Sequence, residues 1–276
     1  MEQNNPTNYP PRCINTTGVT DQSSVAGSST MMSGSSSNPR AVTDDQKELI
    51  HKLVYYQTLY EHPSNEDLAR ITDYQPSEGD DPSDAEFRHI IEMTRLTVQL
   101  VVEFAKNLEG FDKLLREDQI TLLKACSSEV MMLRMARKYD VQTDSIVFAN
   151  NQPYTKESYN FAGLGDDIES LLRFCRYMDS MKVNNGEYAL LTAIVTFSER
   201  PGVLEGWKVK KIQEVYMATL KAYVNSRIDP DNDIRYANLL SVLTVLRSLG
   251  DQNKNTLKPK NEKLPPFLVE IWDLLA

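Results

Sequence analysis

The sequence predicts an all-α protein with one small β-hairpin, and three observations lead to this class. Apolar residues recur at helical spacing in most segments after residue 43. Only residues 145–154 combine a run of strand-forming residues with the Asn and Pro residues of a turn. Residues 87–108 carry apolar side chains on two faces, which indicates a helix packed on both sides. We therefore expect helices stacked as a three-layer antiparallel sandwich.

Composition divides the chain of 276 residues into a tail and a domain. Residues 1–40 are rich in Ser, Thr, Asn and Gly, and we expect a disordered tail or linker because such sequence buries too little apolar surface. Residues 41–276 suffice for one large domain. The acidic and basic residues of the tail balance, so the net charge of −9 belongs to the domain. An acidic domain is a poor binder of nucleic-acid phosphates.

Cysteine and histidine usage indicates neither a disulfide framework nor a metal site. The three cysteines (Cys13, Cys126 and Cys175) are widely spaced, and the three histidines stand alone, whereas zinc modules need close pairs. No apolar run approaches the roughly 20 residues that span a bilayer. We expect an intracellular protein without a metal cofactor.

Signals for helix ends organise the first part of the domain. Thr43 is a candidate N-cap for a helix that runs to about Tyr60, and Pro63 stops it. Ser64 then caps a short helical segment. The Pro, Gly and Asp residues of 75–83 predict an acidic loop.

The two-faced helix at 87–108 includes two threonines on one face, Thr94 and Thr97. Their hydroxyls need partners in a buried wall, and either the carbonyl one turn earlier or a polar ligand could supply them. Both interpretations stand for each threonine.

Residues 118–139 form the predicted central helix, which begins beyond a left-handed turn at Gly110. Arg134 lies there among Met131, Met132 and Met135, and a guanidinium in apolar surroundings needs hydrogen-bond acceptors. A ligand is one possible acceptor, and the carboxylates of Glu61 and Glu129 are the alternative. The methionines are either ordinary core or an adaptable cavity lining.

The last third of the chain predicts helices around 168–178, 188–197, 209–223 and 234–249. The fourth is too apolar for one core-facing stripe, so it is either wholly buried or presents leucines to a partner. The candidate interface residues are Leu239, Leu243 and Leu246. We expect Gly250 to end this helix, residues 251–263 to form a polar loop, and a final helix at 267–275 to turn Leu268, Ile271 and Leu275 inward.

One motif suggests an alternative class. Asp80, Asp81 and Asp84 have the DDxxD spacing with which isoprenoid synthases hold magnesium through carboxylates. Gly79 and Pro82 place the motif in a predicted loop instead of on a packed helix, and no second acidic motif accompanies it.

A family resemblance covers residues 43–276 and is dense around the central helix. An aromatic-Ala-Lys run at 104–106, Gly110-Phe111, Asp118-Gln119 and Leu122-Leu123-Lys124 are similar to the signature of nuclear-receptor ligand-binding domains. Further stretches resemble the ecdysteroid-receptor group of insects within that family: 129–134, 148–151, 190–195 and 264–272.

The resemblance implies a polyhydroxylated steroid ligand, 20-hydroxyecdysone or a relative, and no enzyme activity. Matching positions give the residues expected to contact it: Glu61, Thr94, Thr97, Met131, Met132, Arg134, Ala149, Tyr159, Asn253 and Trp272. A receptor-like domain whose pocket is filled by side chains, and which only dimerises, is a further alternative.

The resemblance also implies partners and a nuclear location. Lys106 and Glu270, with help from Lys124, would clamp the two ends of an LxxLL coactivator helix, since helix ends bear unpaired carbonyls and amides. The helix at 234–249 would pair with ultraspiracle or with its vertebrate counterpart, the retinoid X receptor. The alternative for the clamp is unrelated surface charges.

Overall fold

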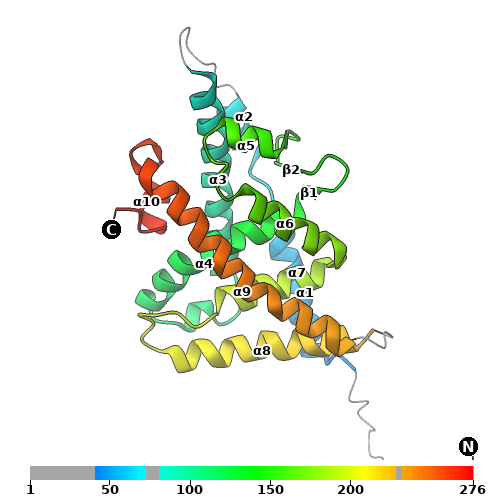
Figure 1. Cartoon of the computed structure of the whole chain (residues 1–276). Coiled ribbons are helices and arrows are strands. Elements are labelled where there is room, and N and C mark those ends of the chain that lie inside the picture. The colour runs from blue at the N-terminus through cyan, green and yellow to red at the C-terminus, as the bar shows by residue number, and fades with distance from the viewer. Residues whose placement is uncertain (1–40, 73–80, 228–231, 276) are drawn as a thin grey trace, which may run out of the picture. The chain divides into compact units, whose positions relative to one another are not determined.

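The computed structural model describes residues 41–72, 81–227 and 232–275, and helices dominate all three ranges (Figure 1). The α-helices are α1 (Asp44–Leu59), α2 (Asn65–Thr72), α3 (Pro82–Lys106), α4 (Arg116–Arg137), α5 (Lys156–Phe161), α6 (Ile168–Ser180), α7 (Asn185–Thr196), α8 (Gly206–Asn225), α9 (Asn232–Leu257) and α10 (Pro266–Ile271). Two short 3₁₀ helices, η1 (Phe111–Lys113) and η2 (Lys258–Lys263), precede α4 and α10. The predicted all-α class is confirmed.

Polar caps start the first three helices. Thr43 forms a capping box with Gln46 at the head of α1, and the Ser64 hydroxyl accepts from the Asp67 amide, 3.1 Å away, at the head of α2. Asp81 caps α3, with Pro82 in its first turn. The helix therefore begins inside the stretch expected to be a loop, and residues 75–80 of that stretch lie outside the described residues.

The central helix α4 is fixed at its start by a buried carboxylate. Gly110 has a φ of 95°, as predicted, and reverses the chain between α3 and η1. Asp118, in the first turn of α4, has no exposed surface. Its oxygens accept from the amides of Leu204 (2.7 Å) and Glu205 (2.9 Å). Asp118 thus joins α4 to the start of α8, because a buried carboxylate requires such donors.

The helices stack in three layers. α1 and α3 form one outer layer, α4 and α7 lie in the middle, and α6 and α9 cover the other side, while α8 packs against both α7 and α9 (Figure 1). Two buried ion pairs reinforce the stack. Glu129 of α4 binds Arg200 at 2.6 and 2.7 Å, and Glu187 of α7 binds Arg235 of α9 at 2.6 Å.

The sheet contains one more strand than predicted. β2 (Ser145–Val147) pairs antiparallel with β3 (Pro153–Tyr154), which is the expected hairpin. β2 also pairs with β1 (Tyr139–Asp140), directly after α4. Tyr139, the first residue of β1, is also the last residue of the predicted central helix, which in the structure ends at Arg137.

Gly250 does not end its helix, which is a correction. α9 continues through it to Leu257, and η2 follows, so the loop expected at 251–263 is helical. The glycine is needed for close packing instead, because a Cβ there would lie 3.0 Å from Cγ of Glu129.

The final helix is shorter than predicted. α10 ends at Ile271, and Asp273 has a φ of 51°, which turns the chain so that Leu274 is buried while Leu275 is 81% exposed. Leu268 and Ile271 do face inward, but the expectation for Leu275 was wrong.

The 3₁₀ helix η2, which precedes α10, is held by two lysine contacts. Lys260 donates to the carbonyl of Gly163, and Lys263 pairs with Asp84 at 2.9 Å.

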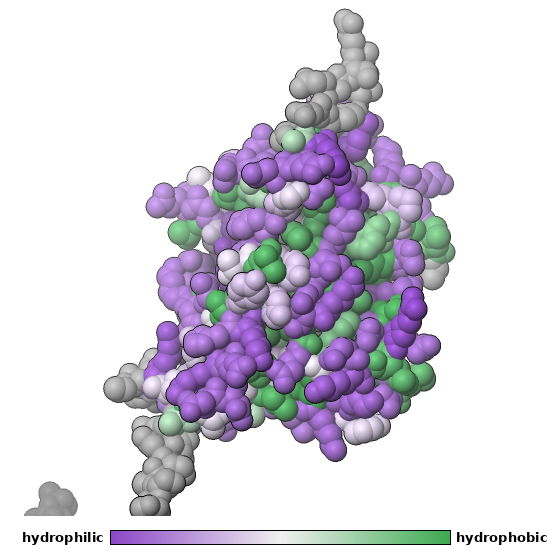
Figure 2. All heavy atoms as spheres, turned by 180° about the vertical axis from the view of Figure 1, so that it is seen from behind, coloured by the Kyte–Doolittle hydropathy of each residue, from purple (hydrophilic) through white to green (hydrophobic). Residues whose placement is uncertain are grey.

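The back of the molecule carries mainly hydrophilic side chains, with hydrophobic ones in small groups between them (Figure 2). Within the described residues, no helix combines the length and apolar character that a bilayer crossing requires.

Candidate ligand-binding site

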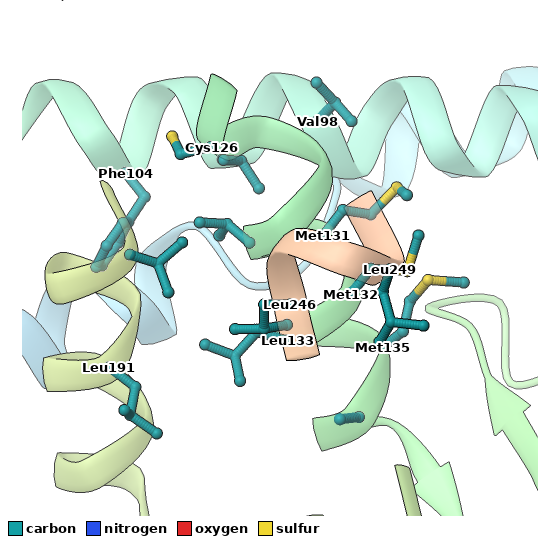
Figure 3. Close-up of a cluster of buried hydrophobic side chains, with 14 of the residues drawn as sticks. Val98, Phe104, Cys126, Met131, Met132, Leu133, Met135, Leu191, Leu246 and Leu249 are labelled. Carbon is teal, nitrogen blue, oxygen red and sulfur yellow. The ribbon is translucent and has the colours of Figure 1, made fainter. Parts of the chain in front are cut away.

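A cavity of about 60 Å³ lies in the core between α3, α4, α5, α6 and α9. The methionines of α4 gather around Leu249 of α9 on this side of the central helix (Figure 3). The lining is mostly apolar and consists of Ile90, Ile91, Thr94, Met131, Met132, Met135, Tyr159, Leu164, Asp167, Ile168, Leu171, Leu249, Gln252, Asn253, Thr256 and Leu257.

Two buried polar atoms of this lining have no hydrogen-bond partner among the described residues. They are the hydroxyl of Tyr159 and Oε1 of Gln252. Leaving such an atom unpaired costs about 1–3 kcal/mol, which a ligand with hydroxyl groups would recover. Burial also raises the pKa of Tyr159 far above its usual range, so the phenol is a neutral donor.

Five of the predicted contact residues do line the cavity. They are Thr94, Met131, Met132, Tyr159 and Asn253. Asn253 lies on the extension of α9 and donates from Nδ2 to the Ser128 hydroxyl at 3.1 Å, so its Oδ1 is left for another donor. An apolar cavity with a few convergent polar groups is typical of small-molecule sites.

Arg134 lies outside the lining and binds neither Glu61 nor Glu129. Its guanidinium donates to the carbonyls of Tyr60 (2.7 Å) and Leu100 (3.4 Å). Burial lowers the pKa of Arg134 to about 10, although the charge of Glu61 raises it, so the group stays charged at neutral pH. The predicted need for acceptors was correct, but backbone carbonyls satisfy it here.

Three more predicted contacts lie apart from the cavity. Glu61 pairs with Arg137, 3.1 Å from its Nε, and the Thr97 hydroxyl donates to the Met93 carbonyl at 2.8 Å. Ala149 is half-buried in the turn between β2 and β3. For Thr97, therefore, the local backbone partner is the one adopted in this conformation.

Trp272 follows α10 and fastens it to α4. The indole is 2% exposed, and its Nε1 donates to the Ser127 hydroxyl at 3.0 Å. Trp272 is not part of the cavity lining in this conformation. Trp272 contacts the central helix α4, which also carries the methionines of the cavity. α4 therefore contacts both the cavity and the C-terminal segment.

The three residues of the predicted clamp are at the surface, but two of them already have acidic partners. Lys106 pairs with Glu103 of its own helix at 2.6 Å, and Lys124 pairs with Asp273 at 2.5 Å. Glu270 is exposed. Both ion pairs are solvent-accessible, so the lysines can exchange partners at little cost.

The structure corrects the predicted interface leucines. Leu239 and Leu246 have no exposed surface and belong to the core, while Leu243 is half-buried. The helix is amphipathic after all, and the apolar residues on its outer face are Ile234 and Val245, 61% and 40% exposed. Leu239 and Leu246 are buried because α9 packs against both α4 and α8, so its leucines serve the core and not an outer face.

Three polar lining residues were missed by sequence reasoning. Gln252 and Thr256 lie in the stretch expected to be a loop, and Asp167 precedes α6, where it accepts from the Thr256 hydroxyl at 2.5 Å. A helical spacing runs through Leu249, Asn253 and Leu257, and this could have revealed that the helix continues.

The acidic motif has structural uses here. Asp81 accepts from the Ser83 amide at 2.9 Å as the cap of α3, which lowers its pKa, and Asp84 pairs with Lys263. Asp80 lies outside the described residues. Among those that are described, no three His, Cys, Asp or Glu side chains are grouped as metal ligands.

Comparison with known proteins gives one consistent family. The profile of the ligand-binding domain of nuclear hormone receptors matches residues 75–258. The chain is 59% identical to the ecdysone receptor of Lucilia cuprina over 237 residues (84% of this chain and 31% of that protein). It is 57% identical to that of Drosophila melanogaster over 244 residues (87% and 28%) and 55% identical to that of Heliothis virescens over 242 (86% and 42%).

The chain thus spans less than half the length of these relatives. The profile match covers most of the described domain, and the helical sandwich with its small sheet is the architecture that the resemblance implied. The chain belongs to the nuclear hormone receptor ligand-binding domain family.

Proposed function

We propose that this chain is the ligand-controlled module of a nuclear transcription factor and that its ligand is an ecdysteroid, 20-hydroxyecdysone or a relative. The observation that carries the proposal is the apolar core cavity, whose lining residues Tyr159 and Gln252 each bury a polar atom that finds no hydrogen-bond partner in the described part of the chain. The similarity to proteins named ecdysone receptors supports the steroid class.

The cavity has to widen to hold a steroid. Its volume of about 60 Å³ is well below the several hundred Å³ of ligand pockets in general. Met131, Met132 and Met135 are the side chains best suited to move, because unbranched thioethers adopt many rotamers at low cost. Tyr159, Gln252 and Asn253 would then hold the hydroxylated side chain of the steroid, and Thr94 would contact the ring system.

The remaining predicted contacts would form the far end of the widened site. Arg134 would exchange one backbone carbonyl for a steroid hydroxyl, while Thr97, Glu61 and the backbone of Ala149 would be reached after side-chain movement. Such an exchange replaces one hydrogen bond with another, so its free-energy cost is small.

Recruitment of a coactivator follows from the position of α10. An LxxLL helix would lie between Lys106 and Glu270, with Lys124 beside it, once the lysines leave Glu103 and Asp273. Heterodimerisation with ultraspiracle or the retinoid X receptor would use the outer face of α9, with Ile234, Leu243 and Val245 in place of the buried leucines.

Saturable binding of labelled 20-hydroxyecdysone tests the ligand assignment. The variant Tyr159→Phe tests whether the steroid binds in this cavity. The variant removes an unpartnered hydroxyl, so it should gain about 1 kcal/mol in stability without ligand yet bind the steroid several-fold more weakly. Tyr177→Phe, on the exposed side of α6, is the control. Absence of saturable binding would favour a domain that only dimerises, and unchanged affinity in Tyr159→Phe would place the steroid elsewhere.

A further inference from the structure

A groove lies between the start of α1, the connection from α3 to η1, and α8. Its volume is about 250 Å³. We call it the α8 groove, defined by its lining residues Asp45, Gln46, Leu49, Glu109, Gly110, Lys113, Ile212, Val215, Tyr216 and Thr219. It shares no lining residue with the core cavity, and it contains none of the residues assigned above to coactivator binding or to the dimer surface.

One edge of the α8 groove is the segment 109–113, which two hydrogen bonds hold beside α8. The Tyr216 hydroxyl donates to the Glu109 carbonyl at 2.9 Å. Lys208 Nζ donates to the Lys113 carbonyl at 3.3 Å. Residue 109 therefore lies near residue 216 and residue 113 near residue 208, so the segment runs antiparallel to α8. These bonds fix the edge of the groove without any occupant.

The middle of the α8 groove is apolar and open. Val215 is 56% exposed, and Ile212, one turn before it on the same face of α8, is half-buried. Gly110 approaches this face closely, because a Cβ there would lie 3.1 Å from Ile212. Exposed apolar side chains with a polar rim are typical of surfaces that bind a partner.

The rim of the α8 groove carries charges of both signs. Glu109 and Lys113 are exposed and lie at opposite ends of the segment 109–113, and Asp45 adds an exposed carboxylate from the first turn of α1. None of these three side chains forms an ion pair with another residue of the ranges 41–72, 81–227 and 232–275. A partner can therefore pair with them without breaking an existing ion pair.

We propose that the α8 groove binds a short extended segment of a protein partner, with a basic residue, a large apolar residue and an acidic residue at alternate positions. Alternate side chains of an extended chain point to one side, so all three would face the groove. The base would pair with Glu109, the apolar side chain would contact Ile212 and Val215, and the acid would pair with Lys113.

The dimensions of the α8 groove agree with this occupant. At about 1.5 Å per residue, the helix from Lys208 to Tyr216 is about 12 Å long, which is close to the length of four residues of extended chain at about 3.3 Å each. The volume of about 250 Å³ is below the about 300–1,000 Å³ of small-molecule sites. It suits one large side chain better than a whole ligand.

A synthetic peptide tests the proposal. The full chain, labelled with ¹³C at the Ile and Val methyls, is titrated at low ionic strength with the blocked peptide Gly-Lys-Ala-Phe-Ala-Glu-Gly. Saturable shifts of Ile212 and Val215 are expected. Ile91 of the core cavity and Ile234 on the outer face of α9 should not shift. Replacing the Phe of the peptide with Ala should weaken binding about tenfold, because the apolar contact is lost.

Two variants and a control locate the contacts. Glu109→Lys should weaken binding of this peptide about threefold, and it should bind the peptide with Glu in place of Lys more tightly than the unmodified protein does. A general loss of structure could not produce that gain. Val215→Ser should weaken binding about threefold, followed through Ile212. Val141→Ser, at a similarly exposed position in the turn between β1 and β2, should change nothing.

Three results would overturn the proposal. The first is the absence of saturable shifts of Ile212 and Val215, or a saturable shift of Ile91 in their place. The second is equal binding of a peptide with Ala in place of both Lys and Glu, which would indicate an uncharged occupant. The third is a Glu109→Lys variant that keeps the peptide preference of the unmodified protein.

Discussion

Arg134 shows how one side chain links the site to the fold. It donates to the carbonyl of Tyr60, the C-cap residue of α1, and so fastens that helix end to the central helix. The same guanidinium is our candidate partner for a steroid hydroxyl, so its two roles require a choice of acceptor.

Arg134→Ala is therefore expected to affect both stability and binding. Loss of a charge-assisted hydrogen bond should lower the free energy of unfolding by about 1.5–3 kcal/mol and weaken ecdysteroid binding more than tenfold. Urea denaturation and steroid titration measure the two effects. Thr121→Val is the control, because the Thr121 hydroxyl donates to the Glu117 carbonyl of its own helix and the residue does not line the cavity. A stability loss with unchanged steroid affinity would leave Arg134 with a structural role alone.

The buried thiols give a prediction for alkaline pH. Burial raises the pKa of Cys126 and of Cys175 from 9.0 to about 12. A group whose pKa is higher in the folded state stabilises it below pH 9, and this contribution is lost as pH rises from 9 towards 12. With Cys13 replaced by Ser, iodoacetamide at pH 8 should modify the unfolded protein and leave the native one intact. Rapid alkylation of native protein would contradict the burial of both thiols.

At the scale of elements, Gly250 shows a limit of reading sequence. Capping residues predicted the starts of α1 and α2, because a cap acts within a few residues of chain. Glycine is common just after the end of a helix, which is why Gly250 predicts an end there. Its actual role is to leave room for Glu129 of α4. The sequence pattern does not show which residue of another helix lies nearby. It therefore predicts too early an end for α9 and misses Gln252 and Thr256 of the cavity lining.

Gly250→Ala tests the close approach of α9 to α4. Alanine usually stabilises a helix interior by about 1 kcal/mol relative to glycine. Here the new methyl would meet Glu129 Cγ at 3.0 Å, and Glu129 is held by both of its bonds to Arg200, so the substitution should destabilise. Gly206→Ala, whose Cβ meets nothing within 4 Å, should be neutral or stabilising. Thermal unfolding compares them, and stabilisation in both would show that the packing can relax.

At the scale of the whole molecule, the outer face of α9 is the expected dimer surface. Val245→Glu places a charge on this face and should abolish association with a retinoid X receptor ligand-binding domain in sedimentation, while the monomer stays folded. Leu246→Glu, at a position without exposed surface, should unfold the monomer instead. Association that survives in Val245→Glu would move the interface to another face.

We expect the C-terminal helix α10 to couple ligand binding to coactivator binding. Glu270→Lys should prevent recruitment of an LxxLL peptide, because it repels the amide-bearing end of that helix, while steroid affinity without peptide stays near normal. Coupling is reciprocal, so in the unmodified protein the peptide should slow steroid release. Peptide binding in the variant that still rises with steroid would exclude the clamp between Lys106 and Glu270.

The site could be predicted in part, and the limit is physical. Thr94, Tyr159 and Asn253, which the resemblance predicts as ligand contacts, line one cavity, because a shared fold brings matching positions together. Their contact with a ligand stays a prediction. The orientation of Arg134, Thr97 and Trp272 was not predictable, since local acceptors compete with a ligand for the same donors. Which acceptor a donor takes depends on distances that only the assembled core defines.

The two side-chain contacts that hold η2 affect how fast α10 can leave the domain. Lys260 and Lys263 attach this segment to Gly163 and Asp84, so the segment that leads into α10 is fixed to the domain. Its departure requires several bonds to break together, as in a small cooperative unfolding event. Amide protons of residues 258–274 should then exchange with solvent as one group, at one opening rate. If the chain is the ligand-controlled module proposed above, this opening rate would set how long α10 stays in place after the ligand has left.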